Sequence, residues 1–306
     1  MRIPLFAVMP VLNDSASAIQ MTEKLLLLFD QTKYDFNILI VNDGSKYSEC
    51  QNLEALKNTN EKINLLNNEV KTGHQAAIYK GLKWISKNYE HHHVLVMDAD
   101  GEDNPLDSIF LLEKLLLKNE TKAVVAKRAK RKSTIAFKSS YNLFKLAFKL
   151  LTGKQLESGN FFAIRSNWIP TFMEIPTSTN HASVSIIRYC PEFEMVTLNR
   201  SKRFEGKSKM NPASLALHGY GALAVYADIV FSRLLILVAL IATMLYSTGG
   251  IIFLIKIFRS DLLLPGWSSN VILILIGFAT LLLFNFFSST LLLLKINSQS
   301  SRKVVG

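Results

Sequence analysis

The chain has 306 residues, of which 49% are hydrophobic, and a formal net charge of +11. Residues 219–306 carry only six Lys or Arg and two Asp, and two long stretches there are apolar enough to cross a membrane, which excludes a fully soluble protein. No earlier stretch is as apolar, which excludes a multi-span transporter, and two cysteines, Cys50 and Cys190, indicate a reducing, cytosol-facing compartment.

Short apolar runs alternate with longer mixed segments in the first part of the chain. Each run is followed by a turn and then by a helical pattern, which predicts a parallel sheet covered on both faces. We expect strands at 3–9, 36–41, 63–66, 93–97 and 122–126, and helices at 16–29, 72–88 and 105–118. In such an α/β fold, ligands bind at the carboxyl ends of the strands.

Polar segments follow three of these strands, and the one after the fourth strand is strongly acidic. Asp98, Asp100, Glu102 and Asp103 fall within six residues. Like charges this close repel one another unless a cation neutralises them, and Mg²⁺ often binds one or two carboxylates together with substrate phosphates. We therefore predict a divalent metal at Asp98 and Asp100, whereas Asp103 or Asn104 serves equally well as the cap of the next helix.

Basic residues form the second group. Nine Lys or Arg and no acid lie between Ala126 and Leu156, and five more lie between Arg200 and Lys209. Within 134–151, aromatic and apolar residues at helical spacing are flanked by lysines, which is typical of a helix at a membrane surface, although a core-facing helix gives the same stripe. The stripe comprises Phe137, Tyr141, Phe144, Phe148 and Leu151. We favour this membrane contact and expect no nucleic acid partner.

The C-terminal part is expected to be a membrane anchor. We predict a juxtamembrane helix at 211–232 and a hairpin of two spans, at about 234–258 and 271–294, within residues 233–306. Arg233 precedes the first span, and Lys295, Arg302 and Lys303 follow the second, so the positive-inside tendency puts both termini and the catalytic domain, residues 1–210, in the cytoplasm. Hairpin anchors often associate, so a dimer or tetramer is a further expectation.

The order of the motifs resembles the family 2 glycosyltransferases of GT-A fold, and among them the polyprenyl-phosphate glycosyltransferases such as dolichyl-phosphate mannose synthase and bactoprenol glucosyltransferase. Seven segments carry the resemblance along most of the chain: 10–14 (P-V-L-N-D), 41–45 (V-N-D-G-S), 73–81 (G-H-Q-A-A to Gly81), 98–103 (D-A-D-G-E-D), 126–128 (A-K-R), 158–161 (S-G-N-F) and 203–209 (R-F-E-G-K-S-K). Each motif is weak alone, but seven in order before two spans form a strong signal.

The resemblance implies a role for each matching residue. The nucleoside diphosphate sugar, a UDP- or GDP-sugar, would contact Pro10, Asn13, Asp14, Asp43, Gly73, Asp98, Ala99 and Asp100. Asp98, Asp100 and Glu102 would hold Mg²⁺ or Mn²⁺. The phosphate of the lipid acceptor or the diphosphate would meet Arg128, Arg131, Asn160, Arg203, Ser208 and Lys209, and the catalytic set would be Asp98, Asp100, Arg128 and Arg203.

These roles imply an inverting transfer of the sugar to a polyprenyl phosphate, which needs positioning and not deprotonation. Asn42 replaces the first Asp of the family's D-D-G-S motif, and Asn160 takes the place of a charged residue in some relatives. A second interpretation is a glycosyltransferase that acts on a hydroxyl-bearing lipid and uses Glu102, Asp103 or Glu157 as its general base. A third is a non-catalytic, membrane-anchored partner that retains the fold.

Overall fold

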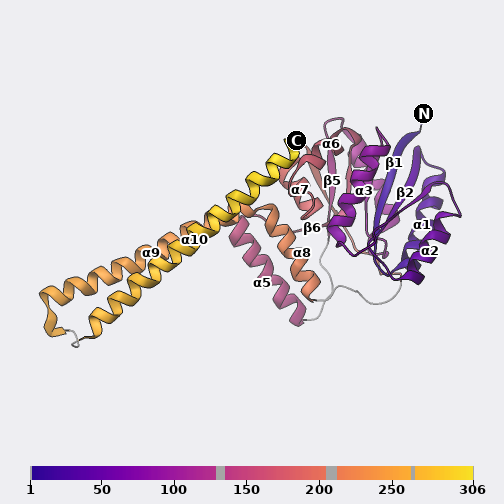
Figure 1. Cartoon of the computed structure of the whole chain (residues 1–306). Helices are drawn as coiled ribbons and strands as arrows, with labels where there is room; N and C mark the ends of the chain where they lie inside the picture. Colours follow the sequence, from indigo (N-terminus) through magenta and orange to yellow (C-terminus); the bar gives the residue numbers. More distant parts are fainter. Residues whose placement is uncertain (1, 129–134, 205–211, 263–265, 306) are drawn as a thin grey trace. The chain divides into compact units, whose positions relative to one another are not determined.

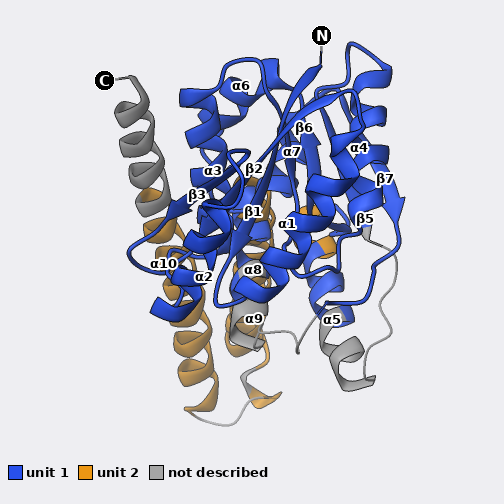
Figure 2. Ribbon diagram, turned by 90° about the vertical axis from the view of Figure 1, so that its right-hand side faces the viewer, with its two compact units in different colours: residues 1–148, 154–225 blue, residues 149–153, 226–306 orange. Residues whose placement is uncertain are grey.

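A computed structural model describes residues 2–128, 135–204, 212–262 and 266–305 (Figure 1). The chain divides into two compact units, coloured separately in Figure 2. The first comprises residues 1–148 and 154–225, and the second comprises 149–153 and 226–306.

A seven-stranded sheet, in the order β3-β2-β1-β4-β6-β5-β7, forms the centre of the first unit. The strands are β1 (Ile3–Val11), β2 (Tyr34–Asn42), β3 (Ile63–Asn67), β4 (His93–Val96), β5 (Ala123–Arg128), β6 (Ser158–Ile164) and β7 (Phe193–Leu198). All five predicted strands are confirmed. β6 and β7 were not predicted. β6 runs antiparallel to both β4 and β5 while the other pairs are parallel, so the sheet is mostly parallel, as expected for the GT-A fold.

Helices cover both faces of this sheet, because alternate residues of the buried strands point to opposite sides. On one face Leu5 and Met9 of β1 pack with helices α1, α2 and α4. On the other, Phe6 and Val8 pack with α3, α6 and α7. The bounds are α1 Ser15–Asp30, α2 Tyr47–Lys57, α3 His74–Asn88, α4 Pro105–Leu117, α6 Ile169–Glu174 and α7 Ala182–Tyr189, with a short 3-10 helix at Ser166–Trp168. The α/β fold with two covered faces is confirmed.

The basic amphipathic segment forms helix α5 (Ile135–Thr152), but its described aromatic residues, Phe144 and Phe148, do not face outward. Phe148 is 1% exposed, and the ring of Phe144 lies against Gly219 of α8 (Pro212–Val225), where an added Cβ would come within 2.6 Å of it. Large apolar side chains exposed on α5 are instead Leu143, Leu146 and Leu150. The predicted membrane-facing stripe is therefore wrong for Phe144 and Phe148, which pack within the protein. The side chains of Phe137 and Tyr141 lie outside the described residues.

The predicted juxtamembrane helix at 211–232 is divided in two. Helix α8 ends at Val225, and the guanidinium of Arg188 on α7 donates to the carbonyl of that residue, so α8 belongs to the first unit. The next helix, α9 (Ala227–Phe258), starts two residues later and runs through the predicted first span without a break.

The second unit is a pair of antiparallel helices, α9 and α10 (Trp267–Val305), joined through a short 3-10 turn at Ser260–Leu262 (Figure 1). Ala227–Phe258 and Trp267–Leu291 have mean hydropathies of 2.3 and 2.5 and are long enough to cross a membrane. Small side chains lie between them at Ala242 and Ala279, both almost fully buried, and Tyr246 shares a 2.9 Å hydrogen bond with Thr280. These two helices have the length and composition of a transmembrane hairpin.

Candidate active site

The carboxyl ends of β1, β2 and β4, which are neighbours in the sheet, bring the predicted polar segments together. Pro10 is buried in β1, paired with Val41 of β2. Asn13 follows β1 in the left-handed region (φ 52°), a conformation that asparagine tolerates better than most residues. Its backbone N–H donates to Ser45 Oγ (2.8 Å), and its side chain accepts from the N–H of Lys46 (2.8 Å), so the two loops brace each other.

Asp43, which follows β2, is engaged entirely by protein donors. Its Oδ1 accepts hydrogen bonds from the backbone N–H and the hydroxyl of Thr72, both 2.7 Å, and from the amide of Asn68 (3.1 Å). Its Oδ2 accepts from the N–H of Gly73 (2.8 Å), and the residue is 2% exposed. Asp43 thus fixes the loop that begins helix α3 and holds Gly73 at φ 100°.

The acidic segment after β4 is a tight turn. Gly101 sits at φ 88°, and the ring of Phe204 lies so close that an added Cβ would come within 2.7 Å of it. Asp103 closes the turn by accepting from the N–H of Asp98 (3.0 Å). Asn104 is the cap of α4, because its side chain accepts from the N–H of Leu106, so the choice left open between Asp103 and Asn104 falls on Asn104.

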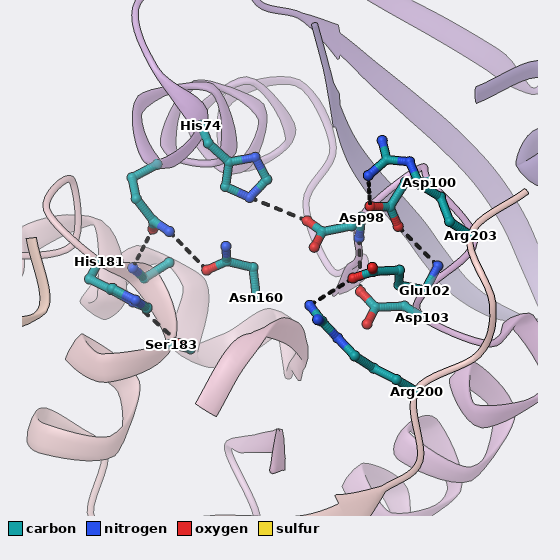
Figure 3. Close-up of polar contacts among 12 residues, drawn as sticks. His74, Asp98, Asp100, Glu102, Asp103, Asn160, His181, Ser183, Arg200 and Arg203 are labelled. Atoms are coloured by element: carbon teal, nitrogen blue, oxygen red, sulfur yellow. Dashed lines mark hydrogen bonds and ion pairs between the residues drawn. The ribbon is translucent and has the colours of Figure 1, made fainter. Parts of the chain in front are cut away.

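Two arginines from the segment after β7 pair with the acids of this site (Figure 3). Arg203 bridges Asp14 (Nη2 to Oδ2, 2.6 Å) and Asp100 (Nη1 to Oδ2, 3.0 Å). Arg200 pairs with Glu102 at 2.8 Å. Burial raises the pKa of Asp100 and the charge of Asp98 raises it further, while the N–H of Glu102 and the Arg203 guanidinium act in the opposite direction. The site therefore concentrates negative charge that is only partly offset by arginine.

A second polar cluster starts at α3 and borders the acidic turn. His74 Nε2 lies 3.3 Å from Asp98 Oδ1. Gln75 accepts from the backbone N–H of Ala182 and donates to Asn160, both at 2.8 Å. The resemblance gave no role to Gln75 or Arg200. Gln75 lies within a matching segment and Arg200 just before one, but the partners of both lie about a hundred residues away in sequence.

The residues 6–178 match the model of glycosyl transferase family 2. The chain belongs to this family. Among relatives, the uncharacterized glycosyltransferase YkcC of Bacillus subtilis (strain 168) is 30% identical over 146 residues, which are 48% of this chain and 43% of YkcC. The match thus spans less than half the length of that relative.

Solved glycosyltransferases share the fold at low identity. Mannosyl-3-phosphoglycerate synthase from Rubrobacter xylanophilus is 17% identical with a TM-score of 0.52, covering 74% of this chain and 73% of that one. Glucosyl-3-phosphoglycerate synthase from Mycobacterium tuberculosis, in complex with Mn²⁺, UDP-glucose and phosphoglyceric acid, is 15% identical with a TM-score of 0.51, covering 74% and 79%. The sheet and its covering helices are therefore those of the GT-A fold, as the sequence predicted.

The metal ligands predicted for this glycosyltransferase are not gathered as a set of three. Among the described residues, no group of three or more His, Cys, Asp or Glu side chains is arranged to hold an ion. Glu102 is turned to Arg200, while Asp98 and Asp100 lie on one turn on either side of the buried Ala99. Two carboxylates on one turn fit a divalent cation whose remaining ligands come from a diphosphate.

The predicted phosphate-binding residues of the basic segments are only partly described. Arg128 is the last residue of β5, and its side chain lies outside the described residues, as do Arg131, Ser208 and Lys209. The adjacent Lys127 pairs with Glu157 at 2.7 Å. Asn160 is buried on β6, which places it at the same end of the sheet as the acidic turn.

Proposed function

We propose that this glycosyltransferase moves a sugar from a UDP- or GDP-sugar to a polyprenyl phosphate at the cytoplasmic face of a membrane. The choice of acceptor rests on one observation: each of the three acids that could serve as the base for a hydroxyl acceptor is already engaged by another group of the protein. Glu102 is paired with Arg200, Asp103 with the N–H of Asp98, and Glu157 with Lys127. A phosphate monoester is already an anionic nucleophile at neutral pH and needs no such base.

The donor would lie across the carboxyl ends of β1, β2 and β4. Asn13 and Asp14 border the place for the nucleoside, and Asp98 and Asp100 face the place for the diphosphate. A bound Mg²⁺ or Mn²⁺ would supply charge stabilisation for the departing diphosphate. Because Arg203 spans Asp14 and Asp100, it is placed to exchange a carboxylate for a diphosphate oxygen when donor binds.

The transfer itself needs only one bond exchange. An oxygen of the acceptor phosphate forms a bond to the anomeric carbon while the bond from that carbon to the diphosphate oxygen breaks, and the nucleoside diphosphate leaves with the electron pair. The anomeric configuration is inverted. Orientation by the arginines and stabilisation of the leaving group account for the catalysis, since no proton has to be removed.

The anchor supports a lipid acceptor. α9 and α10 are each long and apolar enough to cross a bilayer, and α5 exposes Leu143, Leu146 and Leu150 beside lysines, which suits a helix lying at the lipid interface. Both termini and the catalytic domain would be cytoplasmic, and a homo-oligomer remains a prediction.

The function is tested by purifying the full chain in detergent and supplying a panel of UDP- and GDP-sugars with two acceptors, undecaprenyl phosphate and diacylglycerol. The proposal expects a lipid-extractable product with the phosphate acceptor alone. Product on diacylglycerol alone would show instead that the acceptor is a hydroxyl, and product with neither acceptor under any donor would oppose the proposal.

A further inference from the structure

An amide pair, the partly exposed Gln75 on α3 and the buried Asn160 on β6, adjoins the acidic turn. Asn160 is 6% exposed. Gln75 Nε2 donates to Asn160 Oδ1 at 2.8 Å, and Gln75 Oε1 accepts from the backbone N–H of Ala182 at the start of α7, also at 2.8 Å. The pair therefore links strand β6 to two helices, α3 and α7, that cover the same face of the sheet.

The direction of these hydrogen bonds is fixed from one end. A backbone N–H can only donate, so the Ala182 N–H requires the oxygen of Gln75 to face it. Gln75 must then turn its NH₂ group to Asn160, which in turn must present its oxygen to Gln75. The Asn160 NH₂ group is thereby turned away from Gln75, and within the described residues it donates to no other protein group.

The sheet register places Asn160 beside the proposed metal site. β4 and β6 are antiparallel, with Val96 paired with Phe162. Continuing that register by two residues sets Asp98 opposite Asn160 on the same face of the sheet. Figure 3 shows Asn160 between His181 and Asp98, with His74 next to it.

The resemblance assigns Asn160 to the phosphate of the acceptor, and we propose that Gln75 is a positioning residue that holds the Asn160 amide in the orientation that donates to this phosphate. This inference rests on the proposed function. A phosphate dianion only accepts hydrogen bonds, so a neutral donor beside Asp98 favours it, whereas a carboxylate at position 160 would repel it.

The first test is Gln75→Glu, which keeps the shape of the side chain and its bond from the Ala182 N–H. The second carboxylate oxygen would face Asn160 and draw the Asn160 NH₂ group towards it, so Asn160 would present its oxygen to the acceptor. We expect kcat/KM for undecaprenyl phosphate to fall at least ~10-fold while the KM for the sugar nucleotide stays within about twofold. Gln20→Glu, an exposed change on α1 that adds the same charge, should match wild type, and the melting temperatures of the two variants should agree.

A double-mutant cycle with Asn160→Leu separates positioning from the added charge, because leucine has the shape of asparagine without its donor. If Gln75 acts through Asn160, Gln75→Glu costs little in the Asn160→Leu background. If the two losses multiply instead, Gln75 has an effect of its own and the inference is wrong. Wild-type protein that is inactive on undecaprenyl phosphate would refute the proposed function and the inference with it, whereas active wild type with multiplying losses would refute the inference alone.

Discussion

Asp43→Asn tests whether the aspartate after β2 holds the protein together or serves only the nucleotide. The carboxylate accepts four hydrogen bonds, two of them from the backbone N–H groups of Thr72 and Gly73, and is 2% exposed. Asparagine has the same shape but replaces one oxygen with an NH₂ group. In either orientation of the amide, the NH₂ group would face a backbone N–H, that of Thr72 or that of Gly73, and two donors cannot bond to each other.

The cost follows from the bonds that are lost. A hydrogen bond to a charged group contributes about 1.5–3 kcal/mol, and a buried donor left without an acceptor costs about 1–3 kcal/mol. A total of about 3 kcal/mol lowers the melting temperature of a domain of this size by roughly 6–12 °C. The control is Asp35→Asn on β2, which removes the same charge from an exposed position and should change the melting temperature little.

The assay is thermal unfolding of the full chain in detergent, followed by tryptophan fluorescence and without any nucleotide. If Asp43 only contacted the ribose or base, Asp43→Asn would melt together with Asp35→Asn. That result would refute the reasoning. A clear drop for Asp43→Asn alone would show that the residue supports the start of α3, where His74 and Gln75 reach the site.

Three further predictions concern stability and the arginine bridge. Gly81→Ala would bring a Cβ within 2.7 Å of a methyl group of Val8 on β1. This overpacking should lower the free energy of unfolding, measured by denaturant titration, by about 1–3 kcal/mol. The control Gly250→Ala, whose Cβ would have no atom within 4 Å, should leave it unchanged. Burial lowers the pKa of His93 to about 4, so folding favours its neutral form. His93 therefore contributes its full stabilisation above pH 6.5, and this contribution is lost as the pH falls from 6.5 towards 4. The melting temperature of wild type should fall across this pH range, and that of His93→Gln should depend less on pH. Arg203→Lys keeps the charge but not the two-pronged contact, so sugar transfer should fall at least ~10-fold; a rate equal to that of the exposed control Arg2→Lys would argue against the bridge.

The sequence was enough to predict the strands whose apolar runs are buried on both faces, such as β1 and β2. β6 was missed because its antiparallel place between β4 and β5 depends on pairing between distant segments, which periodicity does not report. The stripe of α5 shows the same limit. Its spacing correctly predicted an amphipathic helix, but only the contact with Gly219 reveals that Phe144 packs inward.

The acidic residues of the candidate site could be predicted from the sequence, but the groups that they contact could not. Asp98 and Asp100 were recognisable because carboxylates crowded after a strand need an explanation. The pairing of Arg203 with Asp14 joins residues 189 positions apart and could not be seen in local spacing. The saturation of Asp43 by backbone donors is likewise a property of the folded loop, although the resemblance assigned that residue to the nucleotide.

The measurement that tests the central claim most directly is the lipid product formed by wild type and by Asp98→Ala from a labelled nucleotide sugar and undecaprenyl phosphate. The account predicts that wild type gives a lipid-linked sugar released by mild acid, as expected of a sugar joined to phosphate. Asp98→Ala, with an unchanged melting temperature, should form it at least ~100-fold more slowly, since the acidic turn would no longer support the leaving diphosphate. An acid-stable product, or undiminished transfer by Asp98→Ala, would contradict the account.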